Sequence, residues 1–133
     1  MKYLLDVNVL LALLFNQHEF HGRVESWVSS LQKNGRPHLA TCPLTELGCV
    51  RIASGIGAFG VDVVFTKNLL QRFKQSKHIS FSFIADSIGV ERLPDWTKKS
   101  RQTTDGYLKA LADEHGYFLA TLDKGIPGAF LIP

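Results

Sequence analysis

The chain of 133 residues has little cysteine and no long apolar segment. Its two cysteines, Cys42 and Cys49, form neither a CxxC pair nor a Cys/His pattern that binds zinc. We therefore expect two reduced, partly buried thiols whose role is packing. The apolar run 9–15 is far shorter than the roughly 20 residues that cross a bilayer. It also lacks the flanks of a signal peptide, so we expect a cytoplasmic protein without membrane contact.

The charge balance is only mildly basic, with 15 Lys and Arg residues against 12 Asp and Glu residues. If several carboxylates are committed to metal ions, the rest of the surface becomes clearly positive. A basic surface around an acidic pit suits a polyanionic substrate. A solvated surface without any such partner accounts for the net charge equally well.

Apolar periodicity and turn residues predict alternating strands and helices. We expect strands at 2–5, 38–40, 79–83, 117–122 and 129–132, with the strongly apolar 117–122 at the centre of the sheet. Helices are expected at 9–15 after an Asn8 cap, 21–33, about 43–54 after a Thr41 cap, 63–74 and 103–115, with one further helical turn at 85–89. This alternation predicts a single α/β domain over 1–133, with three α/β/α layers and a mostly parallel sheet of about four to five strands.

The segment 55–60 matches G-x-G-x-x-G, the pattern of dinucleotide-binding loops. That pattern must follow a strand and open a helix, whereas here it follows a predicted helix. We interpret the segment as a flexible loop.

Four acidic residues occupy informative positions. Asp6 and Asp123 each follow an apolar strand, and ligands of open α/β sheets bind beyond the carboxyl ends of the strands. Asp105 lies at the start of a predicted helix, and Glu46 lies in the first turns of another. Turn formation or helix capping explains each position singly. All four together indicate a shared site.

Clustered carboxylates repel one another and require a compensating cation. Hard oxygen ligands favour Mg²⁺ or Mn²⁺ over zinc, and magnesium pairs naturally with substrate phosphates. Such ions activate water and stabilise the in-line displacement of phosphodiester hydrolysis. The acidic residues therefore predict a metal-dependent phosphodiesterase site.

At these positions the sequence resembles the PIN-domain family, and within it the VapC toxins of bacterial toxin–antitoxin pairs. The resemblance rests on four stretches in the family's order and spacing: LLDVNVLLAL at 4–13, TELGCVR at 45–51, TTDGYL at 103–108 and LATLDKG at 119–125. It covers nearly the whole chain and implies a PIN-like fold. The implied activity is that of a Mg²⁺- or Mn²⁺-dependent endoribonuclease leaving a 5′-phosphate and a 3′-hydroxyl.

The resemblance also assigns roles to individual residues. The four metal ligands it implies are Asp6, Glu46, Asp105 and Asp123. Asn8 would orient Asp6 or a water molecule, Thr121 would bond the carboxylates or a phosphate, and Thr104 would cap the helix that carries Asp105. Arg51 would meet the antitoxin or the carboxylates, and Gly106 departs from the commoner Ala. The family further implies an RNA substrate, a cognate antitoxin that inserts a segment into the acidic pocket, and a homodimer.

Other interpretations stay open. The same fold without catalysis would be an RNA- or protein-binding module, although the intact acidic quartet argues against it. A phosphorylated Asp6 would need a second acid nearby, and position 8 is Asn. Lys98, Lys99 and Arg101 either guide RNA towards Asp105 or form a solvated loop. The remaining candidates are assigned to structure rather than chemistry: His18 and His21 at a helix entry, and Trp27 and Trp96 in packing.

Overall fold

The computed structural model describes all 133 residues and contains one five-stranded parallel sheet. The strands are β1 (Lys2–Leu5), β2 (His38–Thr41), β3 (Ser80–Phe83), β4 (Phe118–Thr121) and β5 (Phe130–Leu131), in the order β3-β2-β1-β4-β5. The helices are α1 (Val7–Leu14), α2 (His21–Gln32), α3 (Pro43–Ala53), α4 (Val63–Lys74) and α5 (Thr103–His115), with 3₁₀ turns at Val90–Arg92 and Ser100–Gln102. The α/β prediction is confirmed, and all four strand pairings are parallel.

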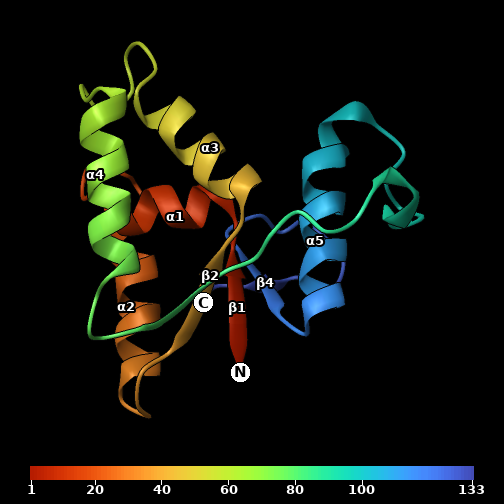
Figure 1. Cartoon of the computed structure of the whole chain (residues 1–133), viewed down its shortest axis with the longest axis horizontal. Coiled ribbons are helices and arrows are strands. Elements are labelled where there is room, and N and C mark those ends of the chain that lie inside the picture. Colours follow the sequence, from red (N-terminus) through yellow and green to blue (C-terminus); the bar gives the residue numbers. More distant parts are fainter.

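The sheet lies between two layers of helices, because successive side chains of a strand point to opposite faces. Tyr3 and Leu5 pack towards α1, α2, α3 and α4, whereas Leu4 packs towards α5. Figure 1 shows the same division, with α5 on one side of the sheet and the other four helices on the opposite side. The predicted three-layer α/β/α architecture is therefore confirmed.

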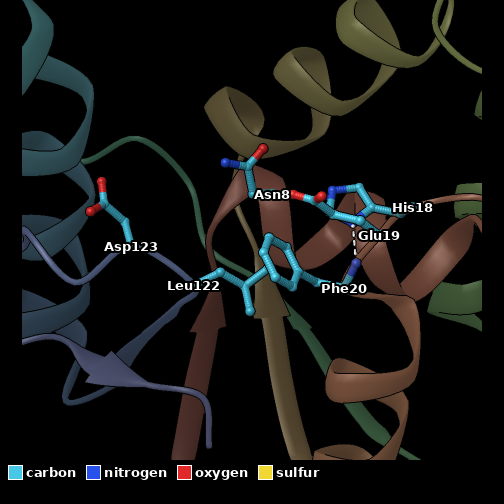
Figure 2. A pocket seen from close by; sticks show the side chains of 6 residues that line it. All are labelled: Asn8, His18, Glu19, Phe20, Leu122 and Asp123. Carbon is cyan, nitrogen blue, oxygen red and sulfur yellow. Dashed lines mark hydrogen bonds between the residues drawn. The ribbon is translucent and has the colours of Figure 1, made fainter.

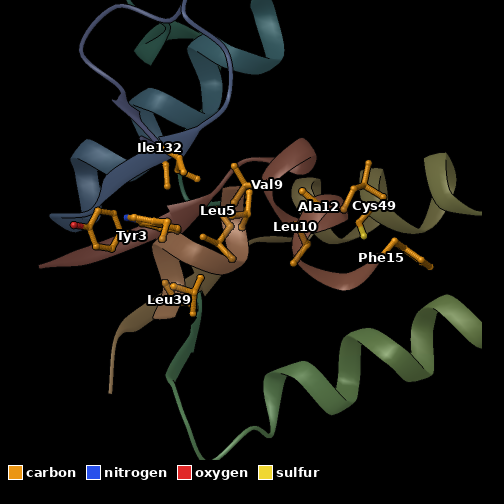
Figure 3. Close-up of a cluster of buried hydrophobic side chains, with 14 of the residues drawn as sticks. Tyr3, Leu5, Val9, Leu10, Ala12, Phe15, Leu39, Cys49 and Ile132 are labelled. Carbon is orange, nitrogen blue, oxygen red and sulfur yellow. The ribbon is translucent and has the colours of Figure 1, made fainter. Parts of the chain in front are cut away.

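The larger core cluster contains 17 buried residues and joins the sheet to α1, α2, α3 and α4 (Figure 3). Leu5, Leu10 and Val9 are completely buried in it, and full burial of such a side chain contributes about 1.5–3 kcal/mol. Trp27 belongs to this core, as predicted. Cys42 and Cys49 are buried and free, which confirms the prediction of two packing thiols.

Several local predictions were wrong at helix starts. Helix α1 begins at Val7 rather than Val9, because Asp6, not Asn8, is its N-cap and accepts the Val7 N–H. Thr41 does not cap α3. It is the last residue of β2, and Cys42 takes the N-cap position with Pro43 in the first turn. Strand β2 therefore ends one residue later than predicted, at Thr41, and α3 follows after Cys42.

Two further predictions need correction. The apolar strand β4 is interior but not central; the central strand is β1. Residues 85–89 form no helical turn, and the 3₁₀ turn follows at Val90–Arg92. Helix α3 buries the face that carries Gly48, Cys49 and Ala53. Leu47 lies outside that face and is 66% exposed. The glycine-rich segment 55–60 connects α3 to α4 and follows no strand, which agrees with its interpretation as a loop.

None of the helices combines the length and the apolar character needed to cross a bilayer.

Candidate functional site

The candidate site lies beyond the carboxyl ends of β1 and β4, which are neighbours in the sheet. Asp6 follows β1 directly, and its N–H continues the ladder by donating to the carbonyl of Ala120 at 3.0 Å. Asp123 follows β4 by two residues. Because parallel strands end at the same edge, both carboxylates emerge on one side of the sheet. Figure 2 shows Asn8, Leu122 and Asp123 beyond the arrowheads of the strands.

Asp6 is the most buried of the four acidic residues, with only 7% of its surface exposed. Oδ1 accepts the Val7 N–H at 2.7 Å, which places this carboxylate at the N-terminus of α1. Burial raises the pKa of Asp6, while the hydrogen bonds from Thr121 and Val7 oppose that shift. A buried carboxylate at the positive end of a helix is held rigidly for a ligand that approaches from solvent.

Thr121 links the two strand-end aspartates. Its hydroxyl donates to Oδ2 of Asp6 at 2.8 Å and accepts the N–H of Asp123 at 3.0 Å. The side chain of Thr121 is completely buried. The predicted bond from Thr121 to the carboxylate cluster is therefore present, and it fixes both the side chain of Asp6 and the backbone of Asp123.

Asp105 reaches the same site from the opposite helical layer. It lies in the first turn of α5 and is partly buried. Burial raises the pKa of Asp105 to about 6, and the negative charges of Asp6 and Asp123 add to the effect. Three aspartates from separate parts of the chain thus interact electrostatically, and their repulsion favours a bound cation.

Glu46 lies in the first turn of α3 and is neutralised by a lysine that sequence analysis missed. Lys74, the last residue of α4, places Nζ 2.9 Å from Oε2 and 3.1 Å from Oε1 of Glu46. The hydroxyl of Thr41 also donates to Oε2. The ammonium group of Lys74 lies over the rings of Phe81 and Phe83, at 5.4 and 5.0 Å from their centroids. Glu46 is therefore held apart from the three aspartates by its own partners.

Thr41 and Thr121 hold equivalent positions on either side of β1. Each is the last residue of its strand, each is completely buried, and each donates to one of the four carboxylates. A signal for Thr41 was present in the sequence, since β2 and β4 both end in Leu-Ala-Thr. No comparable signal pointed to Lys74, because its partner Glu46 is 28 residues away.

The donor set fits a hard divalent cation. All four predicted ligands are carboxylates, and the negative charges of the three aspartates repel one another. The side chains do not yet surround a single point as a cluster of metal ligands. Glu46 pairs with Lys74, so it would have to exchange that lysine for the cation in order to act as a ligand.

The other predicted site residues divide into near and distant groups. Asn8 is exposed in the first turn of α1 and lines a pocket with Asp123. Thr104 does not cap α5, because the helix begins one residue earlier, at Thr103, and Gln102 is its N-cap. Arg51 lies exposed in the last turn of α3 and forms no ion pair with the carboxylates, so of its two predicted contacts the one with an antitoxin stays a prediction.

The basic segment before α5 is exposed, including Lys98, Lys99 and Arg101. Its backbone is ordered by Gln102, whose side-chain oxygen accepts the N–H groups of Lys98 and Lys99. The histidine pair is structural, as predicted. His21 bonds the carbonyl of Ala12 and pairs with Glu25, and Nδ1 of His18 accepts the N–H of Phe20, so both histidines lie at the entry to α2.

No protein-family model matches the chain. Curated proteins do match it over nearly its whole length. Ribonuclease VapC44 of Mycobacterium tuberculosis is 34% identical, and the match covers 97% of this chain and 94% of that protein. Ribonuclease VapC29 of the same organism is 35% identical over 95% of this chain and 89% of its own length, and ribonuclease VapC38 is 32% identical over 92% and 86%. Together with the parallel α/β/α fold, these similarities show that the chain belongs to the VapC family of PIN-domain ribonucleases.

Proposed function

We propose that the chain is the endoribonuclease toxin of a toxin–antitoxin pair and that its activity depends on Mg²⁺ or Mn²⁺. In this proposal residues 1–133 act as one nuclease domain, with Asp6, Glu46, Asp105 and Asp123 as metal ligands. The observation that carries it is the position of Asp6 and Asp123 beyond the carboxyl ends of two neighbouring parallel strands, with Asp105 close enough for their charges to raise its pKa. A bound divalent ion would supply a Lewis acid that lowers the pKa of water and neutralises phosphate charge.

The residues of the chain have distinct tasks in this reaction. Thr121 keeps Asp6 in the orientation required of a ligand, and Asp105 completes the acidic edge from α5. Asn8 is exposed beside Asp123 and is placed to bond water or a phosphate oxygen. The exposed cations Lys98, Lys99 and Arg101 precede α5, so they can attract the RNA backbone towards Asp105. In-line hydrolysis then leaves a 5′-phosphate and a 3′-hydroxyl.

The family also implies an antitoxin, and the surface of α3 and α4 supports a protein partner there. Leu47, Val63 and Val64 are each more than half exposed. A groove of about 370 Å³ between these helices is lined by Leu47, Val50, Val63, Leu70 and Phe83. Contiguous exposed apolar surface of this kind is typical of protein–protein contact sites. Val63→Glu should therefore reduce co-purification of the antitoxin while RNA cleavage persists.

The decisive experiment is cleavage of total cellular RNA by the purified protein, freed of any bound partner, with Mg²⁺, Mn²⁺ or EDTA. Asp123→Asn should abolish discrete, metal-dependent fragments. Asp95→Asn is the matched control, since Asp95 is exposed and makes no ion pair. Equal activity of wild type and Asp123→Asn would indicate a contaminating ribonuclease.

The alternative is a module that binds RNA or protein without cleaving it. Binding that is indifferent to metal, with no cleavage of any RNA under any divalent ion, would establish that alternative. The predicted homodimer is a separate proposal, and sedimentation of the purified chain tests it directly.

A further inference from the structure

A pocket of about 260 Å³ adjoins the acidic edge and shares Asn8 and Asp123 with the proposed nuclease site. It is lined by Asn8, His18, Glu19, Phe20, Leu122 and Asp123. In Figure 2 the Phe20 ring lies between Leu122 on one side and His18 with Glu19 on the other. An aromatic ring and an aliphatic side chain therefore line a pocket that also reaches a predicted metal ligand.

Phe20 is held in place without being part of the core. It is 37% exposed and is not one of the buried residues of either core cluster. Its backbone N–H donates to Nδ1 of His18 at 3.1 Å, which fixes the chain just before α2. The guanidinium carbon of Arg23 lies 5.7 Å from the ring centroid, and Arg23 is itself bonded to the carbonyl of Ile132. The ring is thus ordered and partly open to solvent.

The wall behind Phe20 is also aromatic. The ring centroids of His18 and Phe20 are 6.0 Å apart, and those of His18 and Phe59 are 6.4 Å apart. Phe59 in turn stacks on the buried Phe15, with a centroid distance of 4.5 Å. This chain of contacts ties the pocket wall to the core. A preorganised wall loses little conformational entropy when a flat ligand stacks on it.

The charges around the pocket decide which part of an RNA fits. Glu19 lines it with a carboxylate that is not a predicted metal ligand, so a phosphate group inside the pocket would be repelled even when Asp123 binds a cation. A nucleobase is uncharged, has apolar faces for Phe20 and Leu122, and carries N–H groups that a carboxylate accepts. The side-chain amide of Asn8 offers both a donor and an acceptor to a base edge.

We propose that Phe20 and Leu122 bind one unpaired nucleobase of the RNA, next to the phosphate that is cleaved at the acidic edge. The inference rests on the proposed function, because it takes the substrate to be RNA. It makes this pocket a determinant of substrate choice: a base must leave its helical stack to enter, so cleavage occurs at single-stranded or distorted nucleotides.

The test uses fluorescein-labelled single-stranded oligoribonucleotides of one base type each, in Mg²⁺, with Asp6→Asn in every protein to prevent cleavage. Phe20→Ala should weaken binding by roughly fivefold to a hundredfold, the range for losing one base–aromatic stack. Phe20→Trp should retain affinity. Phe118→Ala is the matched control, since Phe118 is 45% exposed at the opposite end of β4. Circular dichroism checks that each variant is folded.

A second measurement separates stacking from a structural role of Phe20. In these oligonucleotides one abasic nucleotide is moved along the strand. At one position the protein with Phe20 and the Phe20→Ala variant should bind equally, because the base that Phe20 stacks on is missing. If Phe20→Ala loses the same affinity at every abasic position, or loses no affinity at all, the base pocket is overturned. Metal-dependent RNA cleavage by the chain without Asp6→Asn would still support the proposed function in that case. Conversely, stacking without any cleavage would retain the pocket and reject the nuclease.

Discussion

Thr121 donates a hydrogen bond of 2.8 Å to Oδ2 of Asp6, so the last residue of β4 fixes the carboxylate that follows β1. The same hydroxyl accepts the N–H of Asp123. One buried side chain therefore sets the geometry of two predicted ligands. A partner of this kind, bonded to a metal ligand rather than to the metal, commonly changes affinity or activity by roughly 10- to 100-fold when removed.

Thr121→Val should accordingly lower metal-dependent RNA cleavage by roughly 10- to 100-fold, because both hydrogen bonds disappear while the volume stays similar. Thr121→Ser keeps the hydroxyl and should retain most of the activity. Single-turnover cleavage rates at several Mg²⁺ concentrations measure both effects. Thr66→Val is the control for a buried threonine elsewhere, since Thr66 bonds only the carbonyl of Asp62. Activity of Thr121→Val equal to that of Thr66→Val would remove Thr121 from the site.

Lys74→Met should tighten Mg²⁺ binding by roughly fivefold, which corresponds to about 1 kcal/mol for a partly exposed ion pair. The reason is that Lys74 neutralises Glu46, and its removal leaves that carboxylate free for a cation. Isothermal titration calorimetry on the metal-free protein measures the change. Lys67→Met is the control, because Lys67 and Lys74 both line the groove between α3 and α4 but Lys67 forms no ion pair. Weaker Mg²⁺ binding would mean instead that Lys74 positions Glu46 for the metal.

The raised pKa of Asp105 predicts a pH-dependent stability difference in the metal-free protein. The pKa of Asp105 is about 6 in the folded chain against an ordinary value of 3.8 for an unfolded one, so the folded state binds more protons between those values. Its contribution to the free energy of unfolding therefore decreases as pH rises from about 4 to 6. Asp105→Asn removes this contribution, and its Tm relative to wild type should rise over the same interval.

Saturating Mg²⁺ should reverse that comparison above pH 6, because the ionised carboxylate then binds the cation rather than repelling its neighbours. Thermal unfolding of both proteins with Mg²⁺ and with EDTA provides the measurement. A Tm difference that stays constant across the pH range in EDTA would show that neither burial nor the charges of Asp6 and Asp123 raise the pKa of Asp105.

Gly106, next to Asp105, is required by close packing. A Cβ atom at this position would lie 2.3 Å from Oγ1 and 3.3 Å from Cβ of Thr97. Gly106→Ala should therefore destabilise the protein by about 1–3 kcal/mol, although Ala favours a helix by up to about 1 kcal/mol. Urea denaturation checks this. Gly22→Ala in α2, where nothing lies within 4 Å, should instead be stabilising.

Adding Thr97→Ala to Gly106→Ala should restore part of the lost stability. The Oγ1 atom of Thr97 is buried without a hydrogen-bond partner, so its removal costs little and relieves the closest contact. A double variant as unstable as Gly106→Ala alone would place the strain elsewhere. The departure from the commoner Ala at this position is thus explained by Thr97 rather than by catalysis.

The sequence by itself determined the fold class, the bounds of most elements to within a residue or two, and the acidic residues proposed for the candidate site. Apolar periodicity is a local property, and it predicted α4 at Val63–Lys74 without error. Asp6 and Asp123 were identifiable because parallel strands end at a common edge, so position along the chain implied position in space.

Tertiary structure alone decided the contacts between distant segments. Lys74 pairs with Glu46, and Arg23 donates to the carbonyl of Ile132. Gly106 packs against Thr97. Each contact depends on how the segments pack around the sheet. Helix starts also shifted, since Asp6 serves both as a predicted ligand and as the cap of α1. Local patterns specify which face of an element is buried, but packing of those faces fixes which side chains finally meet.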